Sequence, residues 1–88
     1  MTDSRIREIV HEFIRKNFLF DDHRILQDEE SIFAAGIVDS TGILELIAFL
    51  EEHFRIQFGD DELVRDNFDS VARIASFVSK KIPPGVAA

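Results

Sequence analysis

Cysteine and tryptophan are both absent from this chain. Without cysteine the protein can form no disulfide, no thiolate metal site and no thiol nucleophile, so any sulfur chemistry needs a thiol brought from outside. Apolar runs long enough to span a bilayer are also missing. The first residues, MTDSRIREIV, are charged from residue 3 and differ from a signal peptide. We therefore expect a cytoplasmic protein without a membrane span.

Basic residues are scarce, because 10 Lys and Arg stand against 17 Asp and Glu, for a net charge of −7. Nucleic-acid binding needs a basic footprint, and anionic membranes attract basic segments, so the charge argues against both partners. The acids favour partners that present a basic patch. Their other interpretation is that they keep a small protein soluble.

The chain of 88 residues is long enough for one domain, which we place at residues 1–82, followed by a flexible C-terminal tail at 83–88. A domain of this size leaves no room for a large enclosed active site. The sequence contains no P-loop, no dinucleotide-binding glycine pattern and no G-x-S-x-G nucleophile elbow. We predict that the protein is not an enzyme.

Two groups of residues could in principle bind a metal ion. They are His11, His23 and His53, and Asp60, Asp61, Glu62 and Asp66. The histidines are scattered, with no pair spaced for a metal site, and the acids lack the alternating spacing and central glycine of a calcium-binding loop. We expect surface histidines, a cap with a solvated turn, and no metal.

Three segments have the apolar periodicity of amphipathic helices, at residues 4–17, 40–54 and 70–81. The expected inward residues are Ile6, Ile9, Val10, Phe13 and Ile14; then Ile43, Leu46, Ile47, Leu50 and Phe54; and finally Val71, Ile74, Ala75 and Val78. The expected N-caps are Asp3 or Ser4, Asp39 or Ser40, and Asp69 or Ser70.

The segments between these helices lack a sustained period. In the long first connection, residues 18–39, the expected core anchors are Phe18, Phe20, Ile25, Leu26, Ile32 and Phe33. A short helical turn is predicted near residues 28–33, and Gly36 is expected in a backbone conformation that other residues avoid. Residues 55–58 are expected to be extended and anchored by Ile56 and Phe58, with a brief helical turn after Gly59. The fold class is therefore all-α, a small bundle of three main helices plus one short helix.

The Asp39-Ser40 pair at the start of the strongest helix raises the question of what the hydroxyl does. One interpretation is that Ser40 only caps the helix. A second face of this helix nevertheless mixes apolar and acidic residues, which is typical of a docking surface; it comprises Thr41, Leu44, Glu45, Ala48 and Glu52. The long preceding connection also brings Ser40 to one end of the bundle, where a hydroxyl can stay exposed.

The stretch GIVDSTGILELIAFLEE, residues 36–52, resembles the phosphopantetheine attachment segment of acyl and peptidyl carrier proteins. FRIQFGDDELVRDNF and SVARIASFV resemble the family's later segments, so the resemblance runs from about residue 6 to residue 81. Two positions depart from this resemblance. The family usually has an apolar residue where this chain has Thr41, and often an acid where this chain has Gly42. D-S-x-G followed by E-L is similar to D-alanyl carrier proteins, a branch that carries an amino acid.

The resemblance implies an acyl-carrier-protein-like fold in which Ser40, preceded by Asp39, takes 4′-phosphopantetheine from coenzyme A beside a helix N-terminus that favours the phosphodiester. The residues it implies for docking are Glu45, Glu51 and Glu52, with Leu44 and Ala48 between them. The implied partners are a phosphopantetheinyl transferase, an acyl- or aminoacyl-loading ligase, and downstream transferases with basic patches. We expect a free-standing monomer; fatty acyl, polyketide and amino-acid cargo remain open.

The alternative is a non-catalytic helical interaction module in which Ser40 is only a helix cap. It predicts that Ser40→Asp keeps both fold and function, because Asp caps a helix as well as Ser does.

Overall fold

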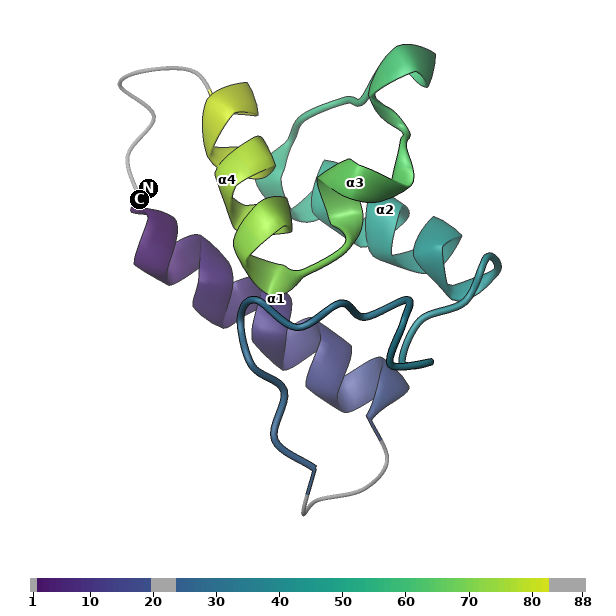
Figure 1. Cartoon of the computed structure of the whole chain (residues 1–88). Helices are drawn as coiled ribbons and strands as arrows, with labels where there is room; N and C mark the ends of the chain where they lie inside the picture. Colours follow the sequence, from purple (N-terminus) through teal and green to yellow (C-terminus); the bar gives the residue numbers. More distant parts are fainter. Residues whose placement is uncertain (1, 20–23, 83–88) are drawn as a thin grey trace.

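A computed structural model describes residues 2–19 and 24–82 of the chain. Over these ranges the elements are α1 (Asp3–Phe18), α2 (Gly42–Phe54), the 3-10 turn η1 (Asp60–Glu62), α3 (Arg65–Phe68) and α4 (Val71–Lys81), with no strand (Figure 1). The predicted all-α class is confirmed. The expected tail at 83–88, the anchor Phe20 and the surface residue His23 lie outside the described residues.

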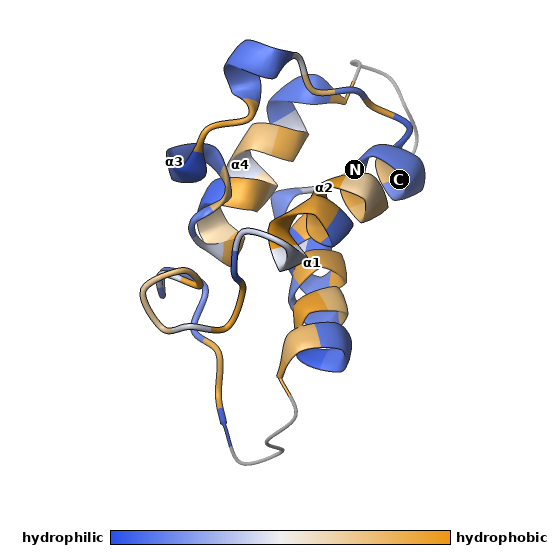
Figure 2. Cartoon of the chain, turned by 90° about the vertical axis from the view of Figure 1, so that its right-hand side faces the viewer, coloured by the Kyte–Doolittle hydropathy of each residue, from blue (hydrophilic) through white to orange (hydrophobic). Residues whose placement is uncertain are grey.

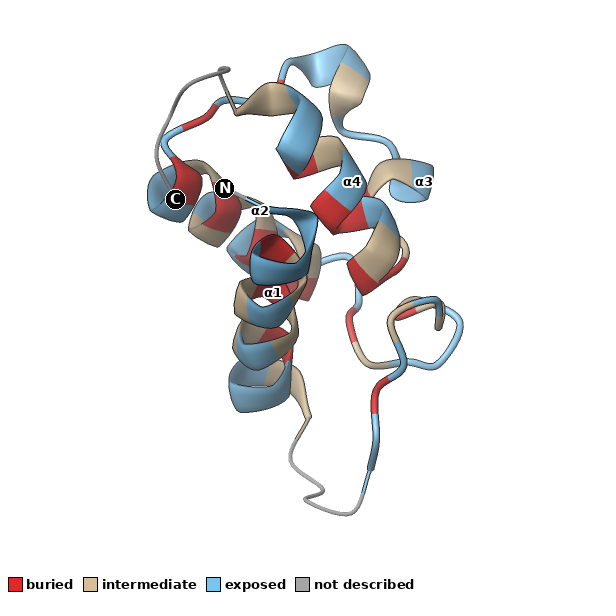
Figure 3. Ribbon diagram, turned by 90° about the vertical axis from the view of Figure 1, so that its left-hand side faces the viewer, coloured by how far each residue is buried: buried red, intermediate tan, exposed pale blue. Residues whose placement is uncertain are grey.

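The core lies where α1, α2 and α4 meet. Its fully buried side chains include Ile6, Val10, Ile14, Leu46, Leu50, Val71, Ile74, Ala75 and Val78. Figure 2 shows hydrophobic and hydrophilic residues following one another turn by turn along α1, and Figure 3 shows buried positions recurring along α1 and α4. Each buried Ile, Leu or Val contributes about 1.5–3 kcal/mol relative to an exposed one. The predicted stripes are confirmed at these positions.

The helix caps agree with the sequence-based prediction in one case and differ in another. Ser70 caps α4, since its hydroxyl accepts from the Arg73 N–H. The cap predicted for the first helix, Asp3 or Ser4, is wrong, because Thr2 Oγ1 accepts from the Arg5 N–H. Asp3 already lies inside the helix. Its carboxylate instead accepts a hydrogen bond from Arg7 Nε, one turn later, at 2.8 Å.

Backbone hydrogen bonds hold the long connection on the helices. The Ile32 N–H donates to the Asp69 carbonyl at 2.8 Å, and the Ala72 N–H donates to the Asp28 carbonyl at 2.8 Å. These two bonds bracket the start of α4. The turns between residues 28 and 38 close with local hydrogen bonds, such as the Glu30 N–H to the Gln27 carbonyl at 3.1 Å, so the short helical turn predicted near residues 28–33 corresponds to hydrogen-bonded turns that do not extend into a helix.

Buried side chains anchor the same connection from within. Leu26, Ile32 and Val38 are buried, whereas Ile25 is 77% exposed, so its assignment as an anchor is wrong. Adjacent residues of an extended segment point to opposite sides, and Leu26 takes the inward side. Gly36 has φ +74°, as expected for a conformation that other residues avoid.

The predicted histidine environment needs one correction. His11 is only half exposed, and its Nε2 lies 2.9 Å from the Leu26 carbonyl, to which it donates. It thereby ties the long connection to α1. His53 is exposed, as expected, and its ring lies 5.1 Å from that of Phe49.

Segment 55–68 connects α2 to the start of α4 and includes η1 and α3. Ile56 and Phe58 are buried, as predicted. The turn predicted after Gly59 is the short η1, and α3 forms separately because Phe68 is drawn into the core. The Phe68 ring lies edge-on to the Phe58 ring at 5.3 Å. The local pattern did not indicate this second turn, since contacts with separate segments stabilise it, among them the Phe58 and Phe77 rings against Phe68 and the Glu62 carbonyl, which accepts from the Asn67 side chain.

An ion pair ties this segment to the end of α4. Glu62 Oε1 accepts from Lys81 Nζ at 2.8 Å and from the Gly59 N–H at 2.7 Å. The hydrogen bond from Lys81, followed by that from Gly59, lowers the pKa of Glu62 below its usual value. The ionised carboxylate is therefore favoured in the folded protein.

We expect the Glu62–Lys81 pair to stabilise the fold at neutral pH and to lose this effect in acid. Because the folded pKa of Glu62 is lowered, its contribution is complete above the unfolded pKa and disappears as the pH falls through the folded pKa. Urea unfolding of the parent and Glu62→Gln should differ at pH 7 and converge in acid. Lys81→Met should match Glu62→Gln at pH 7, and a pH-independent difference would contradict the assignment.

Candidate functional site

Ser40 lies in the turn that leads into α2, two residues before the helix begins. Its side chain is exposed, and its hydroxyl makes no hydrogen bond to any residue that the structure describes. Figure 1 shows this turn on the opposite side of the molecule from the start of α1. A hydroxyl in this position is accessible to another protein.

Asp39, and not Ser40, caps the helix. Its Oδ1 accepts from the Thr41 N–H at 3.0 Å and from the Gly42 N–H at 2.7 Å. The N-cap position of α2 is Thr41, whose side chain makes no capping bond, so of the two predicted residues Asp39 is confirmed as the capping side chain and Ser40 is not. Because the cap is already supplied by its neighbour, helix capping does not explain the hydroxyl of Ser40.

Removing the Asp39 carboxylate should destabilise the fold by a moderate amount. Loss of an N-cap side chain costs about 1 kcal/mol, which for a domain of this size corresponds to a fall in melting temperature of about 4–8 °C. Thermal unfolding of Asp39→Ala should show this fall, and Asp39→Asn, which still accepts the two bonds, should stay near the parent. Equal losses in both variants would mean that the charge, and not the cap, stabilises the turn.

The outer face of α2 carries most of the docking residues expected from the sequence. Thr41, Leu44, Glu45, Ala48 and Glu52 are all exposed, with Leu44 at 66%. No ion pair within the described chain involves Glu45 or Glu52. These five residues, here called the outer face, therefore combine an apolar centre with uncompensated negative charge.

Glu51 differs from the other predicted docking acids. It is half-buried, and its Oε2 accepts from the Phe58 N–H at 3.0 Å. The carboxylate thus holds the extended segment that follows α2. This role depends on a residue seven positions along the chain, so helical spacing alone could not indicate it.

An apolar groove of about 230 Å³ adjoins the outer face between α2 and α3. It is lined by Phe33, Ile43, Leu44, Ile47, Leu63, Val64, Arg65 and Phe68. Leu63 and Val64 are 42% and 47% exposed. Neither residue could be predicted for the site from the sequence, because both are distant from Ser40 in the chain and carry no motif.

Arg65 forms the polar edge of this groove. Its guanidinium carbon lies 4.9 Å above the centre of the Phe33 ring, and its Nε lies 3.9 Å from Asp69 Oδ1. The long connection, α3 and the start of α4 therefore meet beside α2. The site is consequently assembled from segments on both sides of Ser40 in the sequence.

Within residues 2–19 and 24–82, no group of three or more His, Asp or Glu side chains is arranged to bind a metal ion. None of the helices in the same ranges is both long and apolar enough to cross a membrane. The candidate site therefore consists of a free hydroxyl, an acidic and apolar helix face, and an open groove.

Comparison with known proteins identifies similar chains. The D-alanyl carrier proteins of Streptococcus pyogenes serotype M5 (strain Manfredo), serotype M49 (strain NZ131) and serotype M1 are each 35% identical to this chain over 75 residues. The matched region covers 85% of this chain and 92% of each relative. No protein-family profile matches the chain.

Proposed function

Because the chain belongs to the family of acyl, peptidyl and D-alanyl carrier proteins, we propose that it carries an acyl or aminoacyl group as a thioester on a 4′-phosphopantetheine arm attached to Ser40. The observation that carries this proposal is the exposed hydroxyl of Ser40, which neither caps α2 nor bonds to another described residue. The attached arm would supply the thiol that the sequence lacks. Asp39 holds the turn in place.

At the start of α2, the free hydroxyl of Ser40 can bear such an arm. The backbone N–H groups there do not form a binding site for its phosphate. The N–H groups of Thr41 and Gly42 already donate to the Asp39 carboxylate. The helix N-terminus would therefore stabilise the phosphodiester only through the helix dipole. The negative charge of the Asp39 carboxylate partly offsets this effect. Like charges repel, so an anionic phosphodiester on Ser40 should point away from Asp39 and into solvent.

Attachment requires only a nucleophile from this chain. The Ser40 oxygen would form a bond to the phosphorus of coenzyme A next to the pantetheine, and the phosphoanhydride bond would break with release of adenosine 3′,5′-bisphosphate. No side chain among the described residues accepts the Ser40 proton. A base on the transferase, together with a metal ion there, would therefore have to take it.

The outer face of α2 would govern docking to the phosphopantetheinyl transferase, the loading ligase and the downstream transferases. Glu45 and Glu52 would attract basic patches and raise the association rate. Leu44, at the centre, would contribute apolar contact. Leu63 and Val64 extend this apolar surface across the groove, so partners would contact α2 and the segment before α3 together.

The cargo is proposed from the relatives. Their name states that they carry D-alanyl groups, so an aminoacyl thioester is the first cargo to test on this chain. Loading assays with purified ligases and either amino acids or fatty acids would decide between these cargo classes.

Intact-mass spectrometry tests the proposed function. Co-expression with a broad-specificity phosphopantetheinyl transferase should increase the mass of the chain by one phosphopantetheinyl group. An unchanged mass with every transferase tried would overturn the proposal and would favour a helical interaction module, although one in which Asp39 and not Ser40 supplies the cap.

A further inference from the structure

Gly42, the first residue of α2, lies directly against Phe18, the last residue of α1. A Cβ atom added at Gly42 would lie 2.9 Å from Phe18 Cε1 and 3.4 Å from Asp39 Oδ1. The first distance is shorter than real Cβ contacts. Any larger residue at this position would thus displace the Phe18 ring or the start of α2.

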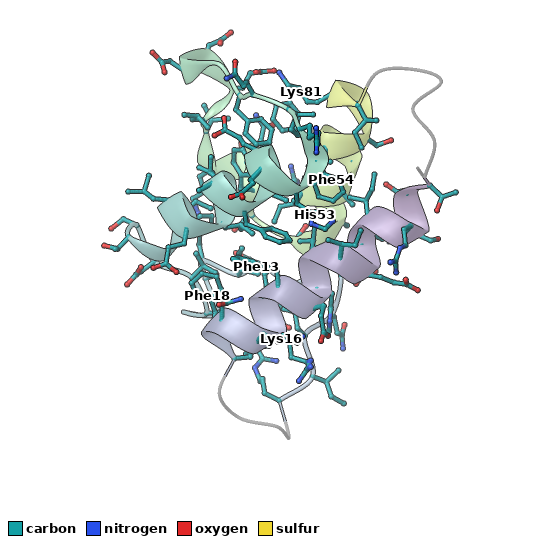
Figure 4. The ribbon with its side chains drawn as sticks, turned by 180° about the vertical axis from the view of Figure 1, so that it is seen from behind. Phe13, Lys16, Phe18, His53, Phe54 and Lys81 are labelled. Atoms are coloured by element: carbon teal, nitrogen blue, oxygen red, sulfur yellow. The ribbon has the colours of Figure 1, made fainter. Side chains whose placement is uncertain are left out.

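The Phe18 ring is held in place by its neighbours. It meets the Phe13 ring edge-on at 6.0 Å, and Phe13 in turn stacks on Phe49 of α2 at 4.0 Å with an interplanar angle of 9°. Figure 4 shows Phe13 and Phe18 on the side of α1 that faces α2. Displacing the ring would therefore disturb the stacked contact between the two helices.

Gly42 and Phe49 lie on nearly the same side of α2, because they are separated by about two helical turns. Helix α1 thus holds α2 at two points, Phe18 against Gly42 and Phe13 against Phe49. Two such points along one face fix both the rotation and the axial position of α2. The start of the helix, where Asp39 caps it, is fixed with them.

The presence of glycine here has no local explanation. Ala is a much better helix former than Gly, and Gly42 has no positive φ angle. The close approach of Phe18 supplies the reason, since only a residue without a side chain leaves room for the ring. The general carrier-protein pattern, in which an acid often occupies this position, does not account for it, whereas the D-S-x-G pattern similar to D-alanyl carrier proteins includes this glycine.

We propose that Phe18 and Gly42 form a positioning pair that sets where Ser40 is presented to the phosphopantetheinyl transferase. The inference rests on the proposed function. Ser40 lies between Asp39 and Thr41, whose side chain and N–H form the cap, so a shift of α2 moves the hydroxyl with the capped turn. Group transfer is sensitive to such shifts, because the reacting atoms must be aligned within a fraction of an ångström.

The test compares Gly42→Ala, Phe18→Leu and the double variant with the parent chain. For each chain, the rate at which the phosphopantetheinyl transferase modifies it is measured as a function of chain concentration, which gives kcat and KM. Gly42→Ala should lower kcat by about tenfold with KM unchanged, because the outer face stays intact. Phe18→Leu removes the atom that a Cβ would meet. The double variant should therefore be modified faster than Gly42→Ala alone.

Phe77→Leu is the matched control, since Phe77 is a half-buried aromatic residue of α4 within a separate cluster. It should lower the melting temperature without changing kcat. If Gly42→Ala does not fold, the comparison of Phe18→Leu with Phe77→Leu decides, because only the former should lower kcat.

A normal kcat in Gly42→Ala, or no recovery in the double variant, overturns the inference. A parent chain that no transferase modifies overturns the proposed function itself, and the inference with it.

Discussion

Ser40→Ala is expected to abolish phosphopantetheinylation completely while leaving the fold intact. The hydroxyl is the only atom of this side chain that can form the phosphoester, so no residual modification should remain. Its removal should change the free energy of unfolding by less than about 0.5 kcal/mol, as for other exposed substitutions, because it makes no hydrogen bond to the described residues. Intact-mass spectrometry and thermal unfolding measure the two effects on one sample.

Ser76→Ala and Ser79→Ala provide matched controls, because both serines are exposed on α4. Each should accept the arm as the parent does. Ser40→Asp should fold normally and remain unmodified, and loss of function in this folded variant would count against the helical interaction module, which predicts that function is kept. If Ser40→Ala still gained the mass of the arm, the attachment site would have to be another residue.

Reversing the charge of Glu45 and Glu52 should produce the second large effect. Opposite charges on partners raise association rates by about 10- to 1,000-fold, so Glu45→Lys/Glu52→Lys should slow association with the transferase by about tenfold or more. The parent rate should fall as ionic strength rises, because salt screens exposed charges. The variant should lose most of this salt dependence. Stopped-flow association kinetics at several salt concentrations would measure both.

Glu8→Lys/Glu29→Lys is the matched control, since it changes the net charge equally but at exposed acids outside the outer face. It should slow association far less. Glu51 is omitted from the reversal because its carboxylate holds the Phe58 N–H, and changing it would alter the fold as well as the charge. Equal slowing in the two double variants would mean that net charge, and not the outer face, steers docking.

The main helices could be predicted from the sequence because their cause is local. An apolar stripe such as Ile6, Val10 and Ile14 must face inward wherever the rest of the chain lies, and these residues are buried. The residues that cap the ends of these helices were less predictable. Thr2 caps α1 and Asp39 caps α2, and neighbouring polar residues compete for such roles on small differences in backbone geometry.

The anchors of the long connection show the same limit. Ile25 and Leu26 are equally apolar, but only Leu26 is buried. An irregular segment has no period that assigns one neighbour to the core. The choice between them depends on where α1 and its His11 ring already lie.

The helical class, the inward stripes, and the exposed position of Ser40 ahead of an acidic and apolar helix face could be predicted from the residues alone. These features follow from composition and from spacing along one segment. The three-dimensional arrangement of the segments was needed to show that Asp39 leaves the Ser40 hydroxyl free and that the groove extends to Leu63 and Val64. The same is true of Glu51, which bonds inward, and of Phe18, which leaves room only for a glycine at position 42. Each of these depends on the packing of separate segments, which no local pattern encodes.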